Sequence, residues 1–323
     1  MKSISIVIPV YNSSKTIERV IVEVEQAILK INNIKDHEII LINDNSRDES
    51  LKVCKKICEA NKKVRVLSLS KNFGQHNAIM AGLSFADGDY IICMDDDLQT
   101  PAYEIGTLID TLEMEDYDVV YGRYESKKHS KFRNFGSSIN YIMAVSLIDQ
   151  PKEIQVTSLF IMRKFVVKEI IKYENPYAYL SGLIFRVTKN IGNVTVQHRE
   201  RKEGKSNYTL GKLFRLWLNG FTNFSIKPLR VATVLGFIFS IICFIFMIYL
   251  IVRKLIDSNV QLGYTSTMVA IVFFGALQLI TVGLLGEYIG RIYMCINKSP
   301  QYVVKETYNL HKENGGNSNE KYE

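Results

Sequence analysis

The chain has 323 residues, of which 47% are hydrophobic and 23% charged, with a formal net charge of +7. This length is enough for one enzymatic domain and a smaller second part. The hydrophobic residues concentrate in the C-terminal third and the basic residues cluster around them, as expected for contact with an anionic membrane surface. No compact basic tract with interleaved aromatics occurs, so we expect no nucleic-acid partner. The N-terminal residues lack an apolar core, so we expect no signal peptide.

The first half of the chain alternates short β-branched runs with segments of helical periodicity. This alternation predicts an α/β fold in which a mostly parallel, Rossmann-like sheet is covered on both faces. The expected strands are residues 3–10, 38–43, 64–69, 90–94 and 118–121. The expected helices are residues 15–30, 46–61, 75–86 and 104–114.

Polar side chains follow the first four expected strands. Ligands of parallel α/β sheets bind at the carboxyl ends of the strands, where these side chains should meet. The residues are Asn12 after the first strand, Asp44 after the second, Lys71 after the third, and Asp95, Asp96 and Asp97 after the fourth.

The strongest single motif is the run MDDDLQ at residues 94–99. Three adjacent carboxylates repel one another unless a positive charge lies near them. A hard divalent ion, held by one or two carboxylates and by substrate phosphates, supplies that charge. In an extended chain Asp95 and Asp97 point to one side and Asp96 to the other, so Asp95 and Asp97 are the predicted ligands of Mg²⁺ or Mn²⁺. The alternative is an acidic turn that is merely solvated.

The C-terminal third contains two uncharged runs, residues 231–252 and 262–286. Each is long enough to cross a bilayer as a helix, which takes about 20 residues. The link between them is short, so the two form a hairpin. Lysine and arginine flank the outer ends of the hairpin more than its loop, which predicts that the catalytic domain and both termini are cytoplasmic. Residues 230–295 therefore form a multi-pass anchor in the cytoplasmic (inner) membrane, with spans at about 231–252 and 264–288.

Apolar residues recur at helical spacing in the segment before the first span, for example Phe214, Trp217 and Phe221. This pattern predicts an amphipathic helix in the membrane interface within residues 206–229, and an ordinary core helix is the alternative. Residues 1–205 are then the catalytic domain and residues 296–323 a cytoplasmic tail.

Four stretches resemble the family 2 glycosyltransferases of the GT-A fold: IVIPVYN at 6–12, INDNSRD at 42–48, LSKNFG at 69–74 and MDDDLQ at 94–99. Four more resemble the polyprenyl-phosphate branch: HRER at 198–201, GKSNY at 204–208, KPLR at 227–230 and LGEYIGR at 285–291. That branch includes dolichol-phosphate mannose synthases and bacterial undecaprenyl-phosphate sugar transferases. The resemblance extends to about Lys305.

The resemblance implies a role for each matching residue. Asp44 would accept a hydrogen bond from uracil, Lys71 stands where the branch often has arginine, and Asp97 would hold the ion that bridges the diphosphate. Helix capping is the alternative for Asp44, and an ordinary turn aromatic is the alternative for Tyr11. The predicted nucleotide site is Pro9, Tyr11, Asn12, Asp44, Lys71, Asp95 and Asp96. The predicted catalytic residues are Asp95, Asp97 and Arg123, of which Arg123 is chosen for its place at a strand end, where it could assist the diphosphate.

A second basic group precedes the expected interfacial helix, where it could hold the phosphate of a lipid acceptor. Contact with the leaflet alone is the alternative. The group is Arg199, Arg201 and Lys205, followed by Ser206 and Tyr208.

The chain departs from its relatives at one point. Many of them have an acid, followed two positions later by arginine, where this chain has Ser158 and Phe160. A catalytic-base role therefore does not transfer. A phosphate monoester has a second pKa near 6, so such an acceptor needs little deprotonation.

The expected function is inverting, metal-dependent transfer of a sugar from a nucleotide sugar, a UDP-hexose, to a polyprenyl (undecaprenyl) phosphate, in cell-envelope glycan synthesis. The resemblance also implies that homotetramers occur. Two alternatives stay open: a processive polysaccharide synthase and an inactive membrane scaffold that binds sugar nucleotides. The sole tryptophan, Trp217, lies outside the Gln-x-x-Arg-Trp motif usual in the synthases.

Overall fold

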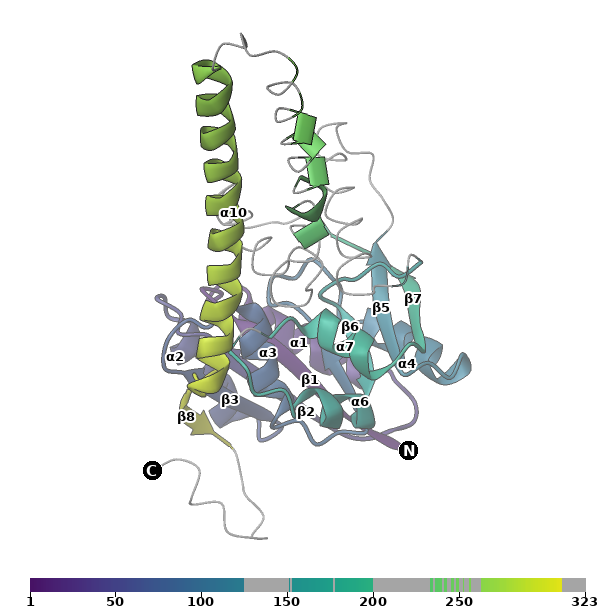
Figure 1. Ribbon diagram of the computed structural model, residues 1–323. Coiled ribbons are helices and arrows are strands. Elements are labelled where there is room, and N and C mark those ends of the chain that lie inside the picture. The colour runs from purple at the N-terminus through teal and green to yellow at the C-terminus, as the bar shows by residue number, and fades with distance from the viewer. Residues whose placement is uncertain are drawn as a thin grey trace. The chain divides into compact units, whose positions relative to one another are not determined.

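The computed structural model describes residues 1–124, 151, 153–176, 178–199 and 263–309, with scattered positions between 233 and 256. It divides into two compact units, Met1–Asn207 with Pro300–Glu323, and Tyr208–Ser299. The first unit contains the sheet and the second contains the long helix α10 (Figure 1).

The sheet has eight strands in the order β7-β5-β6-β4-β1-β2-β3-β8. Strands β4, β1, β2 and β3 are parallel neighbours, which confirms the predicted parallel core. Strand β6 is antiparallel to β4 and β5, and β8 is antiparallel to β3, so the sheet is mixed at both sides of this core. The strands are β1 (Lys2–Val10), β2 (Ile34–Asn43), β3 (Val64–Leu69), β4 (Tyr90–Cys93), β5 (Val119–Tyr124), β6 (Phe160–Arg163), β7 (Ile191–Val196) and β8 (Val304–Tyr308).

Helices cover both faces of the sheet. Ile6, Val7 and Ile8 of β1 are all fully buried, and consecutive strand residues point to opposite faces. The Ile6 and Ile8 face shares a core with α1, α2 and α4. The opposite face packs on α3, where a Cβ on Gly82 would lie 2.6 Å from Val7, so glycine allows the close approach. The first-unit helices are α1 (Ile17–Ile28), α2 (Ser50–Ala60), α3 (Gln75–Leu83), α4 (Glu104–Met114), α6 (Lys164–Ile170) and α7 (Leu180–Val187).

The second unit contains α10 (Tyr264–Ile296), which includes the second predicted span and extends beyond it. Its segment Phe273–Ile296 is long and apolar enough to cross a membrane, and it is the one such helix among the described residues. Described positions between 233 and 256 are helical where the first span is predicted. The predicted interfacial segment, residues 206–229, lies outside the described residues.

Three strands have no counterpart in the sequence-based prediction. β6 and β7 follow the predicted strands along the chain, and β8 lies within the segment expected to be a tail. Gln301, just before β8, is buried, and its Nε2 donates to the carbonyls of Tyr173 and Asn175 at 3.2 and 2.9 Å. The chain after α10 thus returns to the sheet, as β8 beside β3.

Candidate active site

The carboxyl ends of the four parallel strands meet at one edge of the sheet, and hydrogen bonds join the loops that follow them. The Tyr11 N–H after β1 donates to Asp96 Oδ2 after β4 at 3.2 Å. The Asn12 N–H donates to Ser46 Oγ after β2 at 3.0 Å. The loops that carry the predicted polar residues therefore lie together at this edge.

Asp44 connects the end of β2 to the turn before α3. It is 3% exposed, and its two carboxylate oxygens accept the N–H groups of Phe73 at 2.7 Å and Gly74 at 2.9 Å. Burial raises the pKa of the Asp44 carboxyl, and the two amide donors oppose this shift. Asp44 does not cap α2, whose first residue donates its N–H to Asp48 Oδ1 at 3.0 Å.

The three acidic residues after β4 have different partners. Asp95 Oδ1 accepts from Gln75 Nε2 of α3 at 2.8 Å, and Asp97 Oδ1 accepts the Gln99 N–H at 3.1 Å. Asp96 is bonded to the β1 loop, and burial, with Asp95 and Asp97 beside it, raises the pKa of its carboxyl to about 6. The tripeptide is thus held from β1 and from α3.

Asp95 and Asp97 suit a hard divalent cation, because both are half-buried carboxylates at a strand end. No group of three or more His, Cys, Asp or Glu side chains in the described residues could hold a metal ion. Oxygen atoms of a substrate or of water could complete the coordination of an ion at these two residues. Mg²⁺ and Mn²⁺ accept such mixed coordination by carboxylates and phosphates.

The nucleotide-site residues of the first and third loops differ in exposure and in partners. The Tyr11 side chain is 40% exposed at the edge of the sheet. Asn12 has φ of +56°, and its Oδ1 accepts the Arg47 N–H at 2.9 Å, so it supports the loops. Lys71 is exposed, with Nζ 5.0 Å from the centroid of the Phe73 ring. Pro9 lies in β1 opposite Ile42 of β2.

Comparison with known proteins identifies the family. The family model described as "Glycosyl transferase family 2" matches residues 5–171, and the one described as "GtrB C-terminal hairpin" matches residues 227–292. The chain belongs to glycosyl transferase family 2. The protein is a glycosyltransferase, with a GT-A fold in its first unit and a hairpin of the GtrB type after it.

Its relatives match along nearly their whole length. An undecaprenyl-phosphate 4-deoxy-4-formamido-L-arabinose transferase of Proteus mirabilis is 31% identical over 97% of this chain and 96% of its own. An SfII prophage-derived bactoprenol glucosyl transferase of Shigella flexneri is 31% identical over 94% of this chain and 98% of its own. A solved glucosyl-3-phosphoglycerate synthase of Mycobacterium tuberculosis, crystallised with Mn²⁺, UDP-glucose and phosphoglyceric acid, is 16% identical over 73% of this chain and 79% of its own, with a TM-score of 0.48.

The basic side chains predicted for the site of this glycosyltransferase lie on different elements and have different partners. Arg123 is exposed at the end of β5, and its Nη2 donates to Thr195 Oγ1 of β7 at 3.3 Å. Arg199 Nη1 lies 3.0 Å from both carboxylate oxygens of Glu23 on α1, while its backbone N–H donates to Gln99 O at 2.7 Å. The other acceptor-site residues, Arg201, Lys205, Ser206 and Tyr208, lie outside the described residues.

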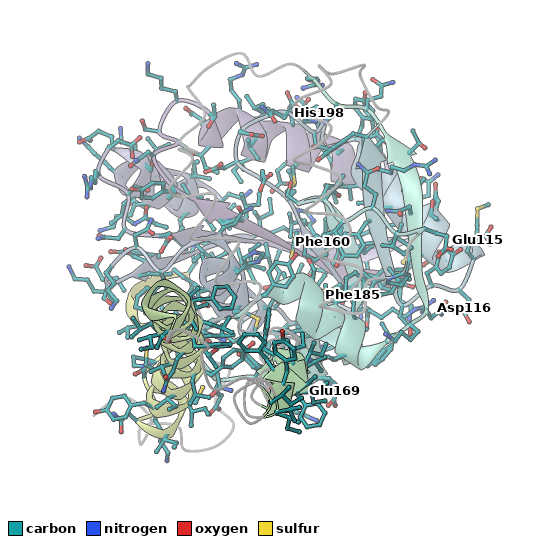
Figure 2. The ribbon with its side chains drawn as sticks, turned by 45° about the horizontal axis from the view of Figure 1, so that its top comes forward. Glu115, Asp116, Phe160, Glu169, Phe185 and His198 are labelled. Atoms are coloured by element: carbon teal, nitrogen blue, oxygen red, sulfur yellow. The ribbon has the colours of Figure 1, made fainter. Side chains whose placement is uncertain are left out.

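The positions that differ from many relatives carry no acid. Phe160 is buried in β6, with its ring 5.2 Å from that of Tyr121, and Figure 2 shows it in the interior while His198 lies near the periphery. Ser158 lies beside the hydroxyl of Tyr124 and lowers the pKa of that hydroxyl.

Sequence reasoning missed two residues of this site, Gln75 and Tyr124. Gln75 is the first residue of α3 and is bonded to Asp95. Tyr124 is the last residue of β5 and contacts Thr100, three residues after Asp97. Nothing in the local sequence distinguishes either from an ordinary polar residue at the end of an element.

Proposed function

We propose that this glycosyltransferase transfers a sugar from a nucleotide sugar, a UDP-hexose, to a polyprenyl phosphate, with inversion at the anomeric carbon. The observation that carries the proposal is the edge where four strand ends bring Asp44 and the 95–97 carboxylates together. The relatives support polyprenyl phosphate as the acceptor, because the two compared above are named for undecaprenyl phosphate and bactoprenol.

The nucleotide of the donor lies against the loops after β1, β2 and β3. Tyr11 offers an exposed aromatic face for the base, and Lys71 offers a cation. Asp44 is a buried acceptor whose carboxylate has lone pairs beyond the two that accept N–H groups, so it can also accept from uracil. The proposed nucleotide site at this edge also includes Pro9, Asn12 and Asp96.

Asp95 and Asp97 hold Mg²⁺ or Mn²⁺ together with the diphosphate of the donor. When bound there, the ion would supply Lewis-acid stabilisation of the departing nucleotide diphosphate. The protein contributes by fixing the carboxylates in advance, through Gln75 for Asp95 and the Gln99 N–H for Asp97. The positive charge of Arg123 helps to neutralise the negative charge of the diphosphate.

The acceptor phosphate binds the segment that begins at His198. The bond from the Arg199 N–H to Gln99 O brings the start of this segment to the loop that contains Asp97. Arg199, Arg201, Lys205, Ser206 and Tyr208 bind the phosphate, whose dianion attacks the anomeric carbon directly. Because the phosphate is already ionised, the absence of an acid at Ser158 and Phe160 does not prevent the reaction.

The C-terminal hairpin anchors the enzyme where its lipid substrate lies. Residues 206–229 lie in the interface and residues 230–295 cross the cytoplasmic membrane twice, with both termini in the cytoplasm. The apolar segment Phe273–Ile296 and the match to the hairpin family support this topology. The proposal also includes assembly of this chain into homotetramers.

Transfer of radiolabelled sugar from a panel of UDP-sugars into undecaprenyl phosphate tests the function, with and without Mn²⁺ or Mg²⁺. We expect metal-dependent label in the lipid from one donor, and none with Asp97→Asn. If folded protein binds UDP yet labels lipid from no donor, the proposed transfer from a UDP-sugar to a polyprenyl phosphate is wrong and the scaffold alternative gains support.

A further inference from the structure

The loop after the acidic tripeptide has a strained backbone. Leu98 has φ of +62°, in the left-handed region that is unfavourable for a residue with a Cβ. Such a conformation persists only when its surroundings hold it in place. We refer to residues 95–100 as the carboxylate loop.

Two segments distant in sequence bond to this part of the loop. The Arg199 N–H, after β7, donates to Gln99 O at 2.7 Å. The Tyr124 hydroxyl, at the end of β5, is 2.9 Å from Thr100 Oγ1. The first contact is a backbone hydrogen bond, whereas the second depends on two hydroxyl groups and can be removed by substitution.

Tyr124 also contacts the segment that carries the acceptor-site residues. Its ring centroid lies 4.2 Å from that of His198, with the ring planes inclined at 37°. Its hydroxyl is hydrogen-bonded to Thr100 and also lies beside Ser158. Burial raises the pKa of this hydroxyl, and the charges of Asp95 and Asp97 raise it further, so Tyr124 stays neutral and keeps its proton.

We propose that Tyr124 is a positioning residue that holds the carboxylate loop and the beginning of the acceptor segment in one fixed arrangement. Its hydroxyl acts on the loop through Thr100, and its ring acts on the segment through His198. Because Asp97 is three residues before Thr100, loss of the hydroxyl lets Leu98 relax and moves Asp97 away from the geometry that binds metal. The inference rests on the proposed function, since it takes Asp97 as a metal ligand.

Mn²⁺ binding tests this role independently of transfer. The full-length chain in detergent, with UDP present, is titrated with Mn²⁺, and the free ion is followed by its electron paramagnetic resonance signal. We expect Tyr124→Phe to raise the dissociation constant for Mn²⁺ by about fivefold, the effect of losing one partly buried hydrogen bond. Thr100→Val should give the same rise, and the double variant no more than either single one.

Tyr103→Phe is the matched control. The Tyr103 hydroxyl donates to Gln197 Oε1 at 2.7 Å, so this variant also removes a tyrosine hydrogen bond to the segment after β7. No described hydrogen bond joins the Tyr103 hydroxyl to the carboxylate loop, and we expect the Mn²⁺ affinity of this variant to equal that of the wild type. Thermal unfolding of each variant establishes that the fold is retained.

Equal Mn²⁺ affinity in Tyr124→Phe and wild type overturns the proposal. An equal loss in Tyr124→Phe and Tyr103→Phe overturns it too, because the effect then comes from the segment in general. If the wild type binds no Mn²⁺ with UDP, the metal role of Asp97 is wrong and the inference falls with it. If the wild type binds Mn²⁺ but labels no lipid, the proposed transfer reaction fails while the variants still decide the role of Tyr124.

Discussion

The two ends of the parallel strands both carry polar clusters, and the clusters differ in how their charges are balanced. At the amino ends, Arg65 Nη1 lies 2.7 Å from Glu38 Oε2 and 3.6 Å from Asp87 Oδ2. Glu38 also accepts from the Ser5 hydroxyl at 2.5 Å. At the carboxyl ends, no ion pair between described residues includes Asp44, Asp96 or Asp97, whose described partners are N–H and hydroxyl groups.

The difference separates a structural cluster from a binding site. A charge that is paired within the chain needs no ligand, whereas Asp96 and Asp97, which have no ion pair with a described residue, suit a cation from outside. We therefore expect substitutions at the amino ends to lower stability and leave transfer intact. Substitutions at the carboxyl ends should do the reverse.

The largest effect is expected for Asp97→Asn. Loss of the anionic ligand should lower transfer by at least about 100-fold, because metal stabilisation of a leaving group is worth several kcal/mol. The thermal unfolding midpoint should stay near that of the wild type, since Asp97 is half-buried and accepts only one described hydrogen bond. Lipid-linked product and unfolding are measured on the same preparation. A large fall in the midpoint would show that Asp97 is structural.

Arg65→Ala should give the opposite pattern. Removing the cation leaves the mostly buried Glu38 carboxylate unpaired, at a cost of about 2 kcal/mol of unfolding free energy. Transfer per folded molecule should not change. Lys52→Ala is the control, because the Lys52–Glu49 pair is exposed and should contribute less than about 0.5 kcal/mol. Equal stability losses in the two variants would contradict the structural role of the amino-end cluster.

Gln75→Leu should have a smaller effect, at the carboxyl end. It removes the donor 2.8 Å from Asp95 Oδ1 and keeps a side chain of similar size on α3. We expect transfer to fall by about tenfold, and the Mn²⁺ concentration for half-maximal activity to rise, because one charge-assisted hydrogen bond is lost. Kinetics at a series of Mn²⁺ concentrations measure both. An unchanged metal dependence would mean that Gln75 does not position Asp95.

The smallest effect concerns Asp89, just before β4. Hydrogen bonds from the Ser3 N–H at 2.9 Å and the Ser3 hydroxyl at 3.1 Å hold the pKa of its carboxyl below the ordinary 3.8, the backbone bond contributing most. Since the folded pKa is lowered, this stabilisation is present above pH 3.8 and disappears as the pH falls through the folded pKa. Asp89→Asn should therefore make the acid-side fall in the unfolding midpoint slightly shallower. Superimposable pH profiles would exclude this contribution.

The sequence by itself determined the parallel core and the position of the carboxylates. Alternating β-branched and helical segments are local patterns, and each polar residue of the site directly follows its strand. Once the strands are parallel, their carboxyl ends must share an edge, so Asp44 and Asp97 could be placed near one another without coordinates.

Only the tertiary structure decided how those carboxylates are held. The bonds of Asp44 to the turn before α3, of Asp95 to Gln75 and of Thr100 to Tyr124 join residues 20 to 30 positions apart. Strands β6, β7 and β8 also depend on partners distant in sequence. For example, β8 follows the predicted membrane segment along the chain and pairs with β3, which precedes it. No local pattern encodes such contacts, because they form only when the sheet brings separate loops to hydrogen-bonding distance.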